Sequence, residues 1–94
     1  MPRDLLFIFP LKNGFHARPA SAFQELANRY ASTVTVVNEM SGATANGKST
    51  LALVSTMTKE GDRCVVRIEG PDADRAADAI QMFLDETLPH CDDD

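Results

Sequence analysis

The pattern of hydrophobic and polar positions predicts four strands and three helices along this chain. Strands are indicated by β-branched or alternating apolar runs, and helices by apolar residues that recur every three or four positions. The predicted strands span 3–9, 33–38, 43–46 and 64–69, and the predicted helices span 17–31, 48–57 and 73–88. The predicted order of elements is therefore β-α-β-β-α-β-α.

Apolar stripes and end signals define the three helices further. In chain order, the stripes contain Ala20, Phe23, Leu26, Ala27 and Tyr30; then Leu51, Val54 and Met57; then Ala76, Ala79, Ile80, Phe83 and Leu84. Ser49 and Asp72 are the predicted N-caps of the second and third helices, because short polar side chains accept hydrogen bonds from free N–H groups there. Pro89 is expected to end the last helix, and residues 90–94 to form a loose acidic tail.

Strands and helices do not alternate strictly in this order, which favours one mostly antiparallel sheet over a parallel one. Each amphipathic helix needs an apolar partner, and covering one face of the sheet satisfies all three. We therefore expect the α+β class, as an open-faced β-sandwich with four strands under three helices. Ninety-four residues support one such domain, 1–94, with the acidic tail starting at about 89.

Composition and charge narrow the function classes. The net charge of −5 argues against nucleic acid as a partner. No apolar run approaches the roughly eighteen residues that cross a bilayer, so we expect no membrane insertion. Cys64 lies in an apolar run and is expected in the core, and Cys91 forms no metal-binding spacing with it. A reduced, cytoplasmic setting without metal or cofactor is the simplest expectation.

The stretch 13–20, Asn-Gly-Phe-His-Ala-Arg-Pro-Ala, carries the candidate chemistry. Asn13-Gly14 is a strong turn signal, and Pro19 suits the first turn of a helix. His16 would then lie at a helix N-terminus, where N–H groups and the helix dipole favour an anion. Arg18 adds donors suited to phosphate. A histidine that carries a phosphoryl group would need such a setting, but from this pattern alone a cap or an exposed polar residue is the commoner role of a lone histidine.

Two motifs together resemble the HPr family, the histidine-containing phosphocarriers of the bacterial phosphoenolpyruvate-dependent sugar phosphotransferase system. Residues 13–20 are similar to the active-site signature of that family, and Asn-Gly-Lys-Ser at 46–49 is similar to its second signature, around a regulatory serine. The turn at 61–62 and the break at 69–73 also fit. The resemblance covers residues 3–88, and a longer segment between 37 and 46 hints at a divergent copy or a domain of a multidomain phosphotransferase.

The resemblance implies a role for each residue of the active-site signature. His16 would accept a phosphoryl group on Nδ1 from enzyme I and pass it to a histidine of an enzyme IIA. Arg18 would stabilise the charge of the group in transfer, and the helix start at Ala17 and Pro19 would cradle its oxygens. The protein would be a carrier that is regenerated in each cycle rather than an independent enzyme, and a transferase if it is part of a multidomain phosphoryl transfer protein. A monomer is the default expectation for a carrier that presents one face to successive partners.

Partner docking and regulation are implied around the second helix. Leu51 and Val54 are candidate docking residues, together with Ala20 and Phe23 near the first helix; for Leu51 and Val54, a place in the core is an equal alternative. Thr50 departs from the large apolar residue that many relatives carry. Ser49 is the candidate for phosphorylation by a serine kinase, with a plain capping role as the alternative.

Two other functions compete with the phosphocarrier. A regulatory binding module on the same fold would dock without transferring phosphate, but the intact His-Ala-Arg-Pro of residues 16–19 counts against it. A small-molecule sensor rests on fold analogy alone, since no glycine-rich or convergent polar motif supports it. The sequence does not identify the sugar pathway or the enzyme IIA partner.

Overall fold

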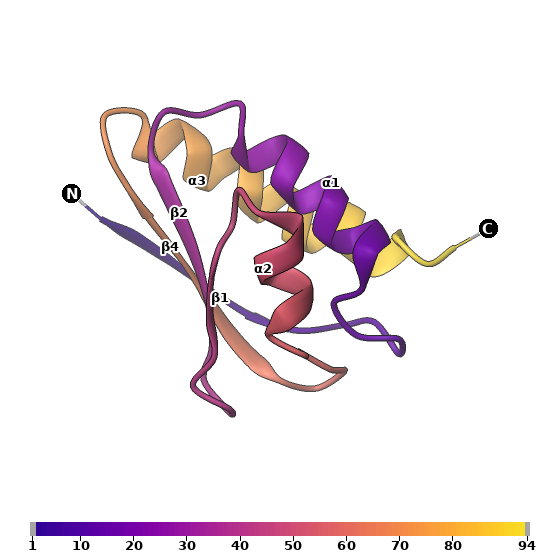
Figure 1. Ribbon diagram of the computed structural model, residues 1–94. Helices are drawn as coiled ribbons and strands as arrows, with labels where there is room; N and C mark the ends of the chain where they lie inside the picture. Colours follow the sequence, from indigo (N-terminus) through magenta and orange to yellow (C-terminus); the bar gives the residue numbers. More distant parts are fainter. Residues whose placement is uncertain (1, 94) are drawn as a thin grey trace.

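The computed structural model describes residues 2–93 and has the predicted order of elements (Figure 1). Its strands are β1 (Arg3–Ile8), β2 (Thr33–Asn38), β3 (Thr44–Asn46) and β4 (Arg63–Glu69), and its helices are α1 (Ala17–Ala27), α2 (Thr50–Ser55) and α3 (Ala73–Met82). After α3 the chain continues through a π-helical turn, Phe83–Thr87, and a 3-10 turn, Leu88–His90.

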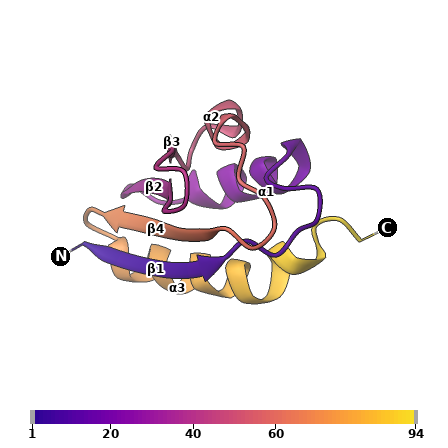
Figure 2. The same cartoon turned by 90° about the horizontal axis from the view of Figure 1, so that it is seen from below.

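The four strands form one sheet in the order β1-β4-β2-β3, and every pairing is antiparallel. The central strands β2 and β4 pair from Thr33 opposite Glu69 to Asn38 opposite Cys64. All three helices lie on the same face of this sheet, as Figures 1 and 2 show from two directions. The α+β open-faced sandwich predicted from the sequence is confirmed.

The core fills the space between the sheet and the helices. Alternation along β4 buries Cys64, Val66 and Ile68, as the sequence predicted. Four buried phenylalanine rings run in a chain of contacts from the end of β1 to the end of α3: Phe9, Phe15, Phe23 and Phe83. Aromatic rings at these separations contribute beyond their buried area. The chain of rings therefore ties the loop before α1 to the body of the protein.

Two helices depart from the predicted pattern. Helix α1 ends at Ala27 rather than at residue 31, and Tyr30 packs against the core from the following turn. In α2, the buried residue is Leu53, whereas Leu51 is 79% exposed and Met57 lies beyond the helix end and is 84% exposed. The prediction that Leu51, Val54 and Met57 form one buried stripe was wrong. A helix of six residues contains too few turns for the spacing of its apolar residues to show which side faces the core.

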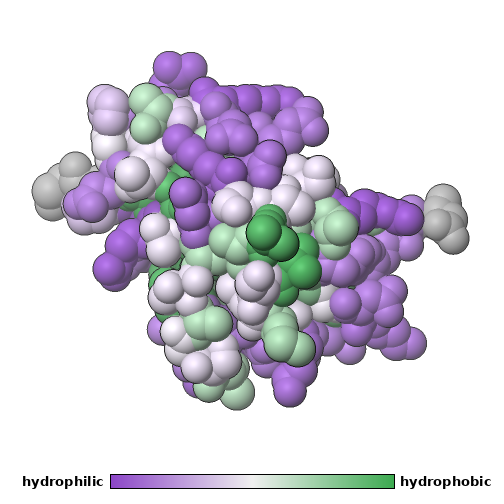
Figure 3. Space-filling view, viewed as in Figure 1, coloured by the Kyte–Doolittle hydropathy of each residue, from purple (hydrophilic) through white to green (hydrophobic). Residues whose placement is uncertain are grey.

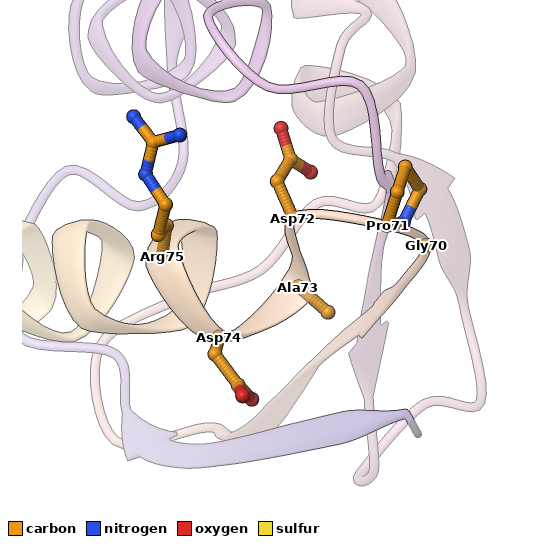
Figure 4. A pocket seen from close by; sticks show the side chains of 6 residues that line it. All are labelled: Gly70, Pro71, Asp72, Ala73, Asp74 and Arg75. Carbon is orange, nitrogen blue, oxygen red and sulfur yellow. The ribbon is translucent and has the colours of Figure 1, made fainter.

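Asp72 lies at the predicted N-cap of α3, but its side chain makes no capping hydrogen bond there. Instead its carboxylate accepts hydrogen bonds from the N–H groups of Ala31 and Ser32 and from the Ser32 hydroxyl. These bonds, led by the one from the Ser32 side chain, lower the pKa of Asp72 to about 2. Figure 4 shows Asp72 and Asp74 pointing to opposite sides of the chain at the start of α3. Asp72 thus joins α3 to the loop before β2.

Pro89 does not end the last helix as predicted. The α-helical part already ends at Met82, and Pro89 lies inside the 3-10 turn. The turn is held by Leu88, which is buried. No helix among residues 2–93 is long and apolar enough to cross a membrane.

Candidate functional site

A tight turn before α1 fixes the backbone of His16. Gly14 has φ +73°, a conformation that glycine adopts without strain. The N–H of Phe15 donates to the carbonyl of Thr58 at 2.9 Å, and the N–H of His16 donates to the carbonyl of Gly14 at 2.9 Å. The side chain of Phe15 is buried among the aromatic rings of the core. Together these contacts hold the turn at 13–15 against both the 58–62 segment and the core.

The 58–62 segment is itself held by a buried polar network. The amide of Asn38 donates to the hydroxyl of Thr58 at 3.1 Å and to the carboxylate of Asp62 at 2.9 Å. The N–H of Lys59 donates to the same carboxylate at 3.0 Å. The hydrogen bond from Asn38, followed by that from Lys59, holds the pKa of Asp62 below its ordinary value. The carboxylate of Asp62, through the two hydrogen bonds to its Oδ2, therefore fixes the segment against which the turn at 13–15 packs.

His16 is the N-cap residue of α1, as the sequence predicted. Its carbonyl accepts the first helical hydrogen bond from Ala20, at 3.0 Å. The geometry of an α-helix leaves the N–H groups of Ala17 and Arg18 without helical partners, and Pro19 has no N–H. The helix start therefore presents two backbone donors beside the imidazole, and Arg18 is exposed next to them.

An open hollow of about 380 Å³ lies beside His16, between the 12–16 turn and the end of α2. Lys12 and Lys59 line it, and both are exposed. Val54 and Met57 form its apolar wall. The site thus combines an imidazole ring with nearby cations, which favour an anionic group. Sequence reasoning missed both lysines: Lys12 lies in the same turn as His16, whereas Lys59 becomes a neighbour of His16 only through the packing of the 58–62 segment.

The residues after α3 return to the site instead of forming the predicted loose tail (Figures 1 and 2). Nε2 of His16 lies 2.7 Å from Oδ1 of Asp92. A guanidinium N–H of Arg18 donates to the carbonyl of Cys91 at 3.4 Å. The His16 side chain is 37% exposed and that of Asp92 21%. The acidic segment is therefore part of the site, and no spacing along the sequence signals this contact.

The predicted docking residues divide into two groups. Ala20 and Phe23 are fully buried, so their prediction as docking residues is corrected: they belong to the core because they form the inner face of α1. Leu51 is exposed and Val54 is half-buried. Hydrophobic side chains gather over α2 in Figure 3. With Met57, which the sequence did not single out for docking, Leu51 and Val54 form what we call the α2 patch.

Polar contacts at the start of α2 connect it to α1. Ser49 is the N-cap, and its hydroxyl accepts a hydrogen bond from the N–H of Ala52 at 3.1 Å, which confirms the capping role. The N–H and hydroxyl of Thr50 both donate to the side-chain oxygen of Gln24. Thr50, which stands where many relatives carry a large apolar residue, thus joins α2 to α1 through these hydrogen bonds. Within residues 2–93, no three metal-ligating side chains converge.

Comparisons with known proteins agree on one family. The family model described as "PTS HPr component phosphorylation site" matches residues 7–86. The chain is 41% identical over 86 residues to multiphosphoryl transfer protein 2 of Escherichia coli K12, covering 92% of this chain and 10% of that protein. It therefore spans about a tenth of the length of the multiphosphoryl transfer proteins it matches.

Shorter relatives match along most of their length. The chain is 35% identical over 77 residues to the phosphocarrier protein HPr of Mycoplasma capricolum, covering 81% of this chain and 83% of that one. Among solved structures, a histidine-containing phosphocarrier protein from Mycoplasma superposes with a TM-score of 0.85 at 29% identity, over 92% of this chain and 96% of that one.

Proposed function

The chain belongs to the HPr family of the phosphotransferase system, and on this premise we propose that His16 accepts a phosphoryl group from phosphorylated enzyme I and delivers it to an enzyme IIA. The observation that carries the proposal is the place of His16. Its ring lies at the start of α1, beside two backbone donors, Arg18 and a hollow lined by two lysines. These groups favour the oxygens of a phosphoryl group.

The proposed transfer is a nucleophilic displacement at phosphorus. The lone pair of Nδ1 of His16 attacks the phosphoryl group, and the bond from phosphorus to the donor histidine breaks, returning its electron pair to that nitrogen. The guanidinium of Arg18 and the N–H groups of Ala17 and Arg18 would stabilise the charge on the three phosphoryl oxygens. Such transfers depend mainly on positioning and electrostatics, which a fixed turn and a helix start supply.

We further propose the α2 patch as the docking surface for donor and acceptor. Val54 and Met57 line the hollow beside His16, and Leu51 is the exposed apolar residue three positions before Val54 on α2. An exposed apolar patch next to a polar centre is typical of a protein-binding surface. A partner seated on the α2 patch would bring its own histidine toward His16.

Phosphorylation of Ser49 by a serine kinase stays a prediction. The hydroxyl is half-buried and accepts a bond from α2, at one side of the proposed docking surface. A phosphate there would add negative charge beside Leu51 and weaken an apolar contact.

The test of the proposed function is phosphorylation of the chain by enzyme I and phosphoenolpyruvate. His16→Ala should abolish labelling. His90→Ala is the matched control, because His90 is the second histidine and is exposed. Equal labelling of the His16→Ala variant and the wild type would overturn the assignment.

A further inference from the structure

We propose that Asp92 is a positioning residue for His16, holding the ring so that Nδ1 is the nucleophile and Nε2 is withheld from phosphorylation. The inference rests on the proposed function, because it concerns the two nitrogens of the same histidine. It starts from the 2.7 Å contact between Nε2 of His16 and Oδ1 of Asp92.

The contact determines which nitrogen carries the proton. An ionised carboxylate accepts hydrogen bonds and cannot donate them, so Nε2 of His16 must be the donor to Asp92. A neutral imidazole carries only one ring proton, and Nδ1 is then left with a free lone pair. Asp92 therefore selects the tautomer in which Nδ1 can attack phosphorus, and it occupies the position from which Nε2 would have to attack.

The carboxylate of Asp92 is also placed to respond to the charge of the reaction. Its second oxygen, Oδ2, is buried and has no hydrogen-bond partner among residues 2–93. When Nδ1 forms its bond to phosphorus, the ring gains positive charge while the proton stays on Nε2. The attraction between the ring and Asp92 then increases, because one partner changes from neutral to cationic.

The segment that carries Asp92 is anchored, so the contact does not depend on Asp92 alone. Leu88 is buried in the core, and the N–H of Cys91 donates to its carbonyl at 3.1 Å. Cys91 also packs against the core, and its carbonyl accepts a bond from Arg18. Two consecutive residues of one anchored segment thus reach the site: Asp92 contacts the His16 ring, and Cys91 contacts the Arg18 guanidinium.

The first experiment measures the ring proton of His16 by ¹⁵N NMR in the wild type, Asp92→Ala and Asp93→Ala. Asp93 is the matched control: it is the next residue, its side chain is 67% exposed, and it contacts His90 instead. We expect the wild type and Asp93→Ala to hold the proton on Nε2 with slow exchange. In Asp92→Ala, the proton should exchange faster and divide between the two nitrogens.

The second experiment identifies the phosphorylated nitrogen, using phosphoramidate as a donor that needs no protein partner. A ring nitrogen forms a bond to phosphorus, and the phosphorus–nitrogen bond of phosphoramidate breaks to release ammonia. We expect the wild type and Asp93→Ala to give Nδ1-phosphohistidine on His16. Asp92→Ala should form Nε2-phosphohistidine as well, and its reaction at Nδ1 should slow about three- to tenfold through loss of the charge.

Asp92→Asn tests the role of the negative charge, because its amide can either accept from Nε2 through the oxygen or donate to Nε2 through the NH2 group and so no longer selects one tautomer. It should therefore divide the ring proton between the two nitrogens and react at Nδ1 as slowly as Asp92→Ala. The proposal is overturned if wild-type His16 is phosphorylated on Nε2, or if Asp92→Ala matches Asp93→Ala in tautomer, product and rate. Since phosphoramidate replaces enzyme I, these outcomes are independent of whether enzyme I phosphorylates the chain.

Discussion

The carbonyl oxygen of Thr58 lies 2.6 Å from the position that a Cβ atom on Gly14 would occupy, and the same carbonyl accepts a hydrogen bond from Phe15. The turn that carries His16 therefore packs directly on the backbone of the 58–62 segment. A side chain at position 14 would have to move one of these two segments, and backbone cannot move aside as the end of a flexible side chain can.

Gly14→Ala should consequently destabilise the fold and disturb His16. We expect a loss of about 2–4 kcal/mol in the free energy of unfolding, from the positive φ together with the clash. Gly42→Ala is the control, since Gly42 has φ +80° and nothing within 4 Å of its missing Cβ; it should cost about 1 kcal/mol. Denaturant unfolding measures both variants. Equal losses would contradict the close packing of the turn at 13–15.

The lowered pKa of Asp72 predicts how the free energy of unfolding changes at acid pH. Its pKa of about 2 in the folded protein lies below the ordinary value of 3.8, so the folded state favours the charged carboxylate. Its contribution is fully present above about pH 4 and is lost as the pH falls through about 2. Asp72→Asn should lower stability near neutral pH and remove this part of the acid dependence.

The measurement for Asp72 is the free energy of unfolding of wild type and Asp72→Asn from neutral pH down to about pH 2. Asp74→Asn controls for the loss of one carboxylate in the same turn, where Asp74 pairs with Arg3 on the surface. The difference between wild type and Asp72→Asn should shrink toward acid pH. A constant difference would show that the bonds from the 31–32 loop do not depend on the charge of Asp72.

If the α2 patch is the docking surface, a carboxylate placed in it should weaken the binding of enzyme I. Leu51→Asp should raise the KM for enzyme I at least tenfold, because it places a carboxylate in an apolar contact. Its reaction with phosphoramidate should be unchanged. Leu6→Asp is the matched control, since Leu6 is 72% exposed and alternates along β1 with the buried Leu5, so it faces the side of the sheet that the helices do not cover. If Leu6→Asp and Leu51→Asp raise the KM equally, the docking surface is not at α2.

Local patterns along the sequence predicted most of the fold. The alternation in β4 and the long stripes of α1 and α3 are repeated signals, and each decided which side of its element faces the core. The six residues of α2 offered no such repetition, so its inner face had to be decided by packing. Asp72 has a side chain suited to capping α3, but its carboxylate accepts hydrogen bonds from a loop about forty positions away in the sequence instead.

The candidate site was predictable only in part for the same reason. His16, Ala17, Arg18 and Pro19 are adjacent in the chain, and their pattern carries its own chemistry. Asp92 joins His16 across 76 positions, through a segment held by the burial of Leu88. An acidic run near a proline gives no sign of such a return, because contacts of this kind follow from tertiary packing.

The central claim is that His16 carries the phosphoryl group. The most direct measurement is the intact mass of wild type, His16→Ala and His90→Ala after incubation with enzyme I, magnesium and phosphoenolpyruvate. The account predicts a gain of one acid-labile phosphoryl group in the wild type and in His90→Ala, and none in His16→Ala. A phosphoryl group that persists in His16→Ala, or a wild type that gains none from any enzyme I, would contradict it.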